Sequence, residues 1–235
     1  MDTKTRHSLK KDRFAQATAS SMSWLSGHRS GVTRWAIVAV SFFTMAIAIL
    51  FLWSWRSAKA ETALGAALDT YNAPLAQPGA PPAPGVYATA SDRSKTANQQ
   101  FVEVASRYGW LSDGAKAHYF AGVTYEELGQ NDAAEKELKA AAGAWDRNLS
   151  NLAKLALASL YHQTNRDPQA IDIYNALAAK PSETVSAAVA QLDLADLYAA
   201  TGQQDKAKAL WAKVKGDDKD GAAGSIAAQR LTGKE

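Results

Sequence analysis

The sequence predicts an all-α protein: one transmembrane helix followed by an α-solenoid of three to four helix pairs with a C-terminal capping helix. Three observations lead to this prediction. Residues 35–55 (WAIVAVSFFTMAIAILFLWSW) are apolar and uncharged, the alanine-rich remainder has almost no strand signal, and one motif recurs at spacings of 36 and 37 residues. With 235 residues, the chain has room for one sizeable domain and additional segments.

Basic residues are concentrated at the N-terminal end of the chain. The first 60 residues carry nine basic and two acidic side chains, whereas the rest of the chain carries 17 basic and 21 acidic ones. Residues 1–34 are therefore expected to form a basic tail on the cytoplasmic side of a membrane. Because the remainder is mildly acidic, it offers no basic face for phosphate groups, and we expect no nucleic-acid partner.

The apolar run of residues 35–55 is predicted to cross a lipid bilayer. As a helix it is about 31 Å long, which matches a hydrocarbon core of about 30 Å. Both ends carry the residue types that prefer the headgroup region. These predicted membrane-interface residues are Arg34, Trp35, Trp53, Trp55 and Arg56.

The charges on either side of the run predict its orientation. Seven basic residues precede it, and only Arg56 and Lys59 follow closely, so the positive-inside rule places the N-terminus in the cytoplasm. A signal peptide cleaved after Ala60 is the alternative, because Ala58-Lys59-Ala60 fits the cleavage pattern. The run is much longer than the apolar part of a signal peptide, which favours an uncleaved anchor.

Two segments connect the anchor to the main domain. Residues 56–73 have a helix-forming composition and are predicted to extend the transmembrane helix. Residues 74–90 contain five prolines, which exclude a helix or a central strand and predict a loop. Residues 91–235 are predicted to form a helical domain, in which residues 221–231 are the capping helix.

Three segments of this domain repeat one pattern: residues 122–138, 158–174 and 195–211. In each, a small residue lets two helices approach closely, and a tyrosine follows three positions later. A residue suited to a left-handed helix cap comes next (Gly129, Asn165 or Gly202), and then an aspartate suited to a helix N-terminus. The predicted repeat-packing residues are Gly122, Tyr125, Ala134, Ala158, Tyr161, Ala170, Ala195, Tyr198 and Ala207.

These segments resemble the tetratricopeptide repeat (TPR), whose 34-residue pattern places a small residue, Tyr, Gly, Ala and a large apolar residue in this order. The resemblance covers about residues 115–214, and it departs from the family where Trp is usual, at His118, Lys154 and Gln191. A fourth, irregular repeat is expected from residues 60–72 and 97–108, with the proline-rich loop as an enlarged turn.

The TPR resemblance implies a concave groove that the first helix of each pair lines. The groove residues that it implies are Lys116, Tyr119, Val123, Glu126, Leu152, Leu155, His162, Val189, Leu192 and Asp196. Tyr119 and Leu155 stand where a carboxylate clamp needs lysine, so capture of C-terminal carboxylates is not expected. The alternative is that Leu152, Leu155 and Leu192 are only core residues between repeats.

Motifs for catalysis are not found in the sequence. The four histidines have no metal-ligand spacing, cysteine is absent, and there is no phosphate loop, dinucleotide fingerprint or GxSxG motif. We therefore expect no enzyme activity, no metal, no cofactor and no small-molecule substrate.

The layout of the whole chain resembles the YfgM-like family, whose members are ancillary subunits of the SecYEG translocon. This resemblance implies a single-pass protein of the bacterial inner membrane with its TPR domain in the periplasm. The partners that it implies are translocon subunits, a periplasmic isomerase and unfolded secreted clients, toward which the protein acts as a chaperone in protein secretion. The alternative is a cell-division or envelope-biogenesis coordinator with TPR repeats.

Overall fold

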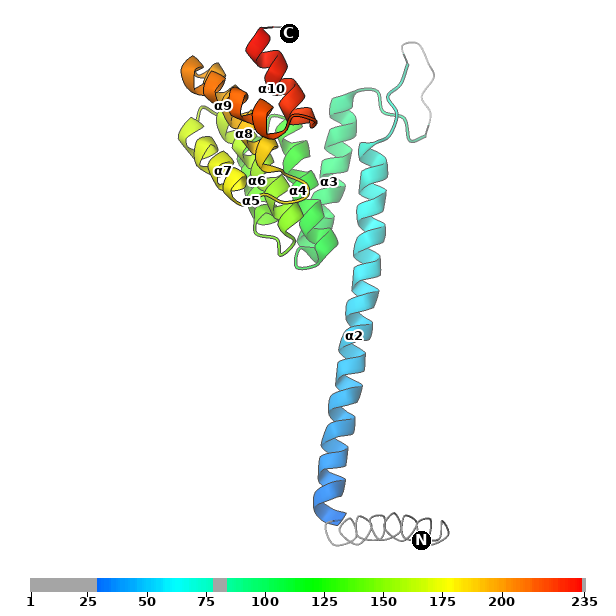
Figure 1. Cartoon of the computed structure of the whole chain (residues 1–235). Helices are drawn as coiled ribbons and strands as arrows, with labels where there is room; N and C mark the ends of the chain where they lie inside the picture. Colours follow the sequence, from blue (N-terminus) through cyan, green and yellow to red (C-terminus); the bar gives the residue numbers. More distant parts are fainter. Residues whose placement is uncertain (1–28, 78–83, 234–235) are drawn as a thin grey trace, which may run out of the picture. The chain divides into compact units, whose positions relative to one another are not determined.

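The structure is a computed structural model that describes residues 29–77 and 84–233. Within these ranges the chain is all-α, as predicted, with nine helices (Figure 1). The loop between two of these helices contains one isolated β-bridge, between Leu75 and Tyr87. The chain divides into two units, Met1–Trp55 and Arg56–Glu235. The predictions for most of the basic tail and for the centre of the proline-rich loop lie outside the described residues.

Helix α2 (Arg29–Tyr71) belongs to both units. In the first unit its apolar side chains are exposed on every face, with Trp35 at 76% and Phe42 at 72% exposure. This helix is long and apolar enough to cross a membrane, by length and composition. The hydroxyl group of Thr44 is satisfied within the helix, since its Oγ1 donates to the Ser41 carbonyl oxygen at 3.0 Å.

The part of α2 in the second unit is buried along one face. Ala60, Leu64 and Ala67 recur at helical spacing and pack in one core cluster with residues of α3 (Ala90–Tyr108) and α4 (Ser112–Glu127). Phe101 of α3 is fully buried there and stacks on Phe120 with ring centroids 5.2 Å apart. The helix ends at Tyr71 and α3 begins at Ala90, so the loop between them is close to the predicted one.

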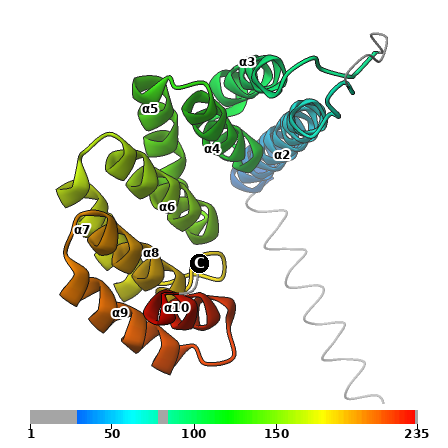
Figure 2. The same ribbon diagram turned by 90° about the horizontal axis from the view of Figure 1, so that it is seen from above.

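Six further helices complete the second unit, and each helix from α3 onward packs on the next one (Figure 2). Contacts also join α4 to α6 and α8 to α10, so alternate helices meet on one side. The six are α5 (Asn131–Ala142), α6 (Arg147–Gln163), α7 (Asp167–Ala179), α8 (Ala187–Ala200), α9 (Gln204–Asp217) and α10 (Ala222–Thr232).

The turns after α4, α6 and α8 share one geometry. Gly129, Asn165 and Gly202 have φ angles of +70°, +58° and +78°, so the predicted left-handed caps are confirmed. In each turn the residue after the cap donates its N–H to the carbonyl of the motif tyrosine: Gln130 to Tyr125 at 2.9 Å, Arg166 to Tyr161 at 2.7 Å, and Gln203 to Tyr198 at 2.8 Å. Each tyrosine therefore lies at the same place, two residues before the last residue of its helix.

The small residues of the repeated segments lie where helices come closest. Ala134, Ala158, Ala170, Ala195 and Ala207 are all fully buried. A Cβ atom on Gly122 would lie 2.6 Å from Cγ of Leu138, because α4 and α5 cross at this point. Of the motif tyrosines, Tyr161 is buried, whereas Tyr125 and Tyr198 are half-buried.

Candidate protein-binding groove

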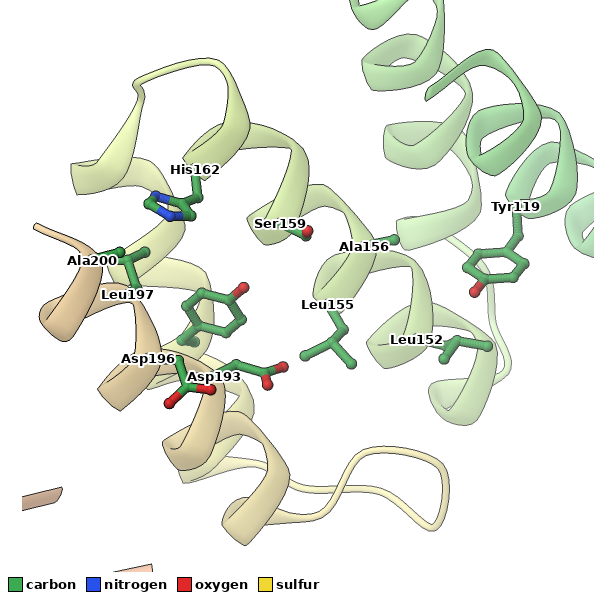
Figure 3. Close-up of a pocket in the computed structure, with 11 residues that line it drawn as sticks. Tyr119, Leu152, Leu155, Ala156, Ser159, His162, Asp193, Asp196, Leu197 and Ala200 are labelled. Carbon is green, nitrogen blue, oxygen red and sulfur yellow. The ribbon is translucent and has the colours of Figure 1, made fainter. Parts of the chain in front are cut away.

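A pocket of about 520 Å³ opens between α4, α6 and α8, with one further residue from α7 (Figure 3). Five of the ten predicted groove residues line it: Tyr119, Leu152, Leu155, His162 and Asp196. The other lining residues are Ala156, Ser159, Tyr174, Asp193, Leu197 and Ala200.

Helical spacing places these residues on single faces of α6 and α8. On α6 the lining residues fall at positions 152, 155, 156, 159 and 162, and on α8 they fall at 193, 196, 197 and 200. Steps of three and four residues put side chains on one stripe of a helix. The pocket is therefore the space between two facing stripes, and Tyr119 of α4 extends it beyond α6 (Figure 3).

The base of the pocket is apolar. Leu197 and Tyr174 are 3% and 5% exposed and belong to the core cluster that joins α6, α7 and α8. Leu155 packs against the same cluster and is half-buried. These side chains give the pocket a rigid aliphatic and aromatic floor.

Two aspartates of α8 give the pocket its charge. Asp196 accepts a hydrogen bond from Nε1 of Trp211 at 2.8 Å and pairs with Arg230 at 3.5 Å. Asp193 is half-buried, and among the described residues no hydrogen bond or ion pair reaches its carboxylate. Burial and the charge of Asp196 raise the pKa of Asp193 to about 6.

Two tyrosines that line the pocket, Tyr119 and Tyr174, have raised pKa values and stay neutral. Burial, followed by the charges of Asp193 and Asp196, raises the pKa of Tyr174. Burial and the charge of Glu126 raise the pKa of Tyr119. Both hydroxyl groups are therefore available as neutral hydrogen-bond donors.

His162 and Ser159 are engaged by neighbouring side chains. Nδ1 of His162 lies 2.6 Å from Oδ1 of Asp167, the first residue of α7. Ser159 Oγ accepts a hydrogen bond from Nε2 of Gln163, which also donates to Glu126. A serine nucleophile needs a hydrogen bond to the imidazole, and among the described residues the hydroxyl of Ser159 is bonded to Gln163 instead.

The remaining predicted groove residues lie outside the pocket. Lys116 pairs with Asp113 at 2.9 Å on the surface of α4. Leu192 is buried in a cluster with residues of α9 and α10, and Val189 packs against the same cluster, so both belong to the core. Helical spacing alone would put Val189 on the stripe of Asp193 and Leu192 on that of Asp196, so only their contacts with α9 and α10 show that neither lines the pocket. Val123 is half-buried, and Glu126 accepts the bond from Gln163 noted above.

Of the other six lining residues, the TPR resemblance also implies Ser159 and Ala200 as groove positions, whereas sequence reasoning missed Ala156, Tyr174, Asp193 and Leu197. Asp193 had a detectable signal, since it precedes Asp196 by three residues and therefore shares its helix face. Tyr174 is the large residue that ends the repeated segment 158–174, a position expected only to pack between helices, and the tertiary structure shows that it also reaches the pocket.

Metal ligands do not gather in the part of the chain that the structure describes, where no group of three or more His, Cys, Asp or Glu side chains could hold an ion. A scan against protein-family models, a search of curated proteins and a search of solved structures each find no match to this chain.

Proposed function

We propose that this chain is a single-pass membrane protein whose TPR-like solenoid binds other proteins through the pocket between α4, α6 and α8. The protein acts as a periplasmic scaffold and chaperone that accompanies the SecYEG translocon, in the manner of the YfgM-like family that it resembles. The observation that carries the proposal is the pocket itself, which is lined by single stripes of α6 and α8.

Three features of the second unit support a TPR-like solenoid. The left-handed caps recur at the spacing of the repeats, the small residues are buried at helix crossings, and alternate helices meet on one side. In repeat proteins these features produce an extended concave surface that contacts other chains. An apolar floor with a few polar groups suits segments of polypeptide rather than one fixed ligand.

The exposed apolar half of α2 supports a membrane anchor. A helix with apolar side chains on all faces is unstable in water and stable in a bilayer. Tethering raises the effective concentration of a weakly binding domain near its partners to about the mM range. A pocket with low affinity is therefore sufficient for binding when the partner lies in or beside the same membrane.

Site-specific photo-crosslinking in intact cells tests the proposed function. A benzoylphenylalanine at Ser159 lies in the pocket, and the same residue at the exposed Gln169 of α7 is the matched control. We expect crosslinks to translocon subunits, a periplasmic isomerase or newly secreted chains from position 159 and not from position 169. Crosslinks to cell-division or peptidoglycan-synthesis proteins from position 159 would replace this proposal with an envelope coordinator.

The orientation of the anchor has its own test, which the absence of cysteine makes simple. Single cysteines at Thr3 and at the exposed Ser91 are treated with a maleimide that does not cross the inner membrane. We expect labelling at position 91 and protection at position 3. The reverse pattern would contradict a periplasmic domain.

A further inference from the structure

The charges around the pocket leave one carboxylate without a counter-ion. Asp196 pairs with Arg230 at 3.5 Å, and the imidazole of His162 is bonded to Asp167. Asp193 has no such partner among the described residues, and its raised pKa reflects the burial of an uncompensated charge beside Asp196. A positively charged group in the pocket would remove this unfavourable interaction.

The surroundings of Asp193 suit a long aliphatic side chain with a charge at its end. Figure 3 shows Asp193 extending from α8 toward Leu155 of α6, with Leu197 on the same helix face. Lysine and arginine bury their methylene groups along such apolar surfaces while the charged head reaches a polar partner. The pocket of about 520 Å³ has room for one such side chain and the backbone that carries it.

We propose that the pocket binds a lysine or arginine side chain of an extended peptide, with its cation at the Asp193 carboxylate and its methylene groups along Leu155 and Leu197. The inference rests on the proposed protein-binding function and names the chemistry of the bound segment. Charge complementarity is the argument for this occupant, since the pocket presents an unpaired anion above an apolar floor.

The test uses fluorescein-labelled decapeptides and the full-length protein in nanodiscs. The probe has one central lysine between leucine and alanine residues, and the matched peptides replace the lysine with norleucine or glutamate. Norleucine keeps the aliphatic chain and removes the ammonium group. Fluorescence anisotropy gives the dissociation constant for each peptide at two salt concentrations.

We expect the lysine peptide to bind about tenfold more tightly than the norleucine peptide, and the glutamate peptide to bind most weakly. In Asp193→Asn the advantage of lysine should disappear, and with it most of the salt dependence. In Asp172→Asn, a matched change at an exposed aspartate of α7, the advantage should remain. The melting temperature of each variant reports whether it is folded.

The possible results separate this inference from the proposed function. Equal binding of the lysine and norleucine peptides would overturn the inference and leave an apolar protein-binding pocket. Binding of none of the peptides, together with no crosslinks from position 159, would overturn both. If Asp193→Asn converts a dimer to a monomer in sedimentation experiments, the occupant is a second copy of the chain, and the basic-peptide inference is wrong.

Discussion

Two carboxylates of the helical domain show opposite uses of a partly buried charge. Glu135 of α5 receives Lys139 and Arg166 at 2.6 Å each and the hydroxyl of Tyr161 at 3.1 Å. These hydrogen bonds, that of Lys139 first, lower the pKa of Glu135 to about 2. Asp193 in the pocket has no such partners among the described residues, and its pKa is raised to about 6.

The difference separates a charge that stabilises the fold from a charge that opposes it. Glu135 joins α5 to the turn between α6 and α7, where Arg166 also lies over the ring of Tyr161 at 4.4 Å. Ionisation of Glu135 therefore favours the native fold, whereas ionisation of Asp193 opposes it. An uncompensated charge that faces a cavity is typical of a functional site, since such sites often lower stability.

The largest expected effect on stability is that of Glu135→Ala. This change removes the acceptor of Arg166 Nη1 and of the Tyr161 hydroxyl, and we expect the free energy of unfolding to fall by about 2 kcal/mol. Chemical denaturation of the detergent-solubilised protein measures it. The control is Glu103→Ala, which removes an exposed pair with Arg107 and should cost about 0.5 kcal/mol or less. Equal losses of unfolding free energy in both variants would show that Glu135 stabilises the fold no more than an exposed ion pair does.

The helix ends and turns around Glu135 and its partners were largely predictable from the repeated sequence pattern. The caps at Gly129, Asn165 and Gly202 depend on local backbone preferences, so the spacing of small and turn residues was enough. The Lys139 contact follows from i,i+4 spacing within α5, but the approach of Arg166 and Tyr161 to the same carboxylate was not predictable, because these two residues lie in another helix and the turn after it. It depends on how α5 packs against α6.

For the same reason, only some of the residues that line the pocket were predicted from the sequence. Tyr119, Leu152, Leu155, His162 and Asp196 were found because a repeat has a fixed inward face. Leu192 and Val189 were assigned to that face, but both pack toward α9 and α10. Alanine on both sides of α8 makes its polar and apolar faces hard to distinguish in the sequence.

The pH dependence of stability gives the next largest effect, and it isolates Glu135 through the variant Glu135→Gln. The folded-state pKa of about 2 lies below the ordinary value of 4.5, so the stabilisation is complete above pH 4.5 and is lost as the pH falls toward 2. We expect wild type to exceed the variant by about 1–2 kcal/mol at pH 6 and to lose this advantage by about pH 2. If the difference in stability between wild type and variant were the same at pH 6 and at pH 2, the ionised carboxylate of Glu135 would not be its source.

Asp193→Asn should have the opposite effect on the pH dependence of stability. The folded-state pKa of about 6 lies above the ordinary 3.8, so wild type is fully stable only below about pH 4 and loses stability as the pH rises through 6. Since the side chain is partly solvated, we expect the variant to be more stable by about 1 kcal/mol at pH 8 and unchanged at pH 4. Thermal melting at both pH values measures this, and a less stable variant at pH 8 would mean that Asp193 has a stabilising partner.

Asp196→Asn should change stability least, because two effects oppose each other. The variant loses the ion pair with Arg230, a partly exposed contact, but it also removes the like charge beside Asp193. An asparagine oxygen can still accept the hydrogen bond from Trp211. We therefore expect a stability change of about 0.5 kcal/mol or less, together with a lower pKa for Asp193, measured by carbon-13 NMR titration of its carboxyl group. Burial is the larger cause of the raised pKa, so the value should stay above that of an exposed aspartate even without Asp196. An unchanged pKa would mean that the two aspartates do not interact and that burial alone raises the pKa of Asp193.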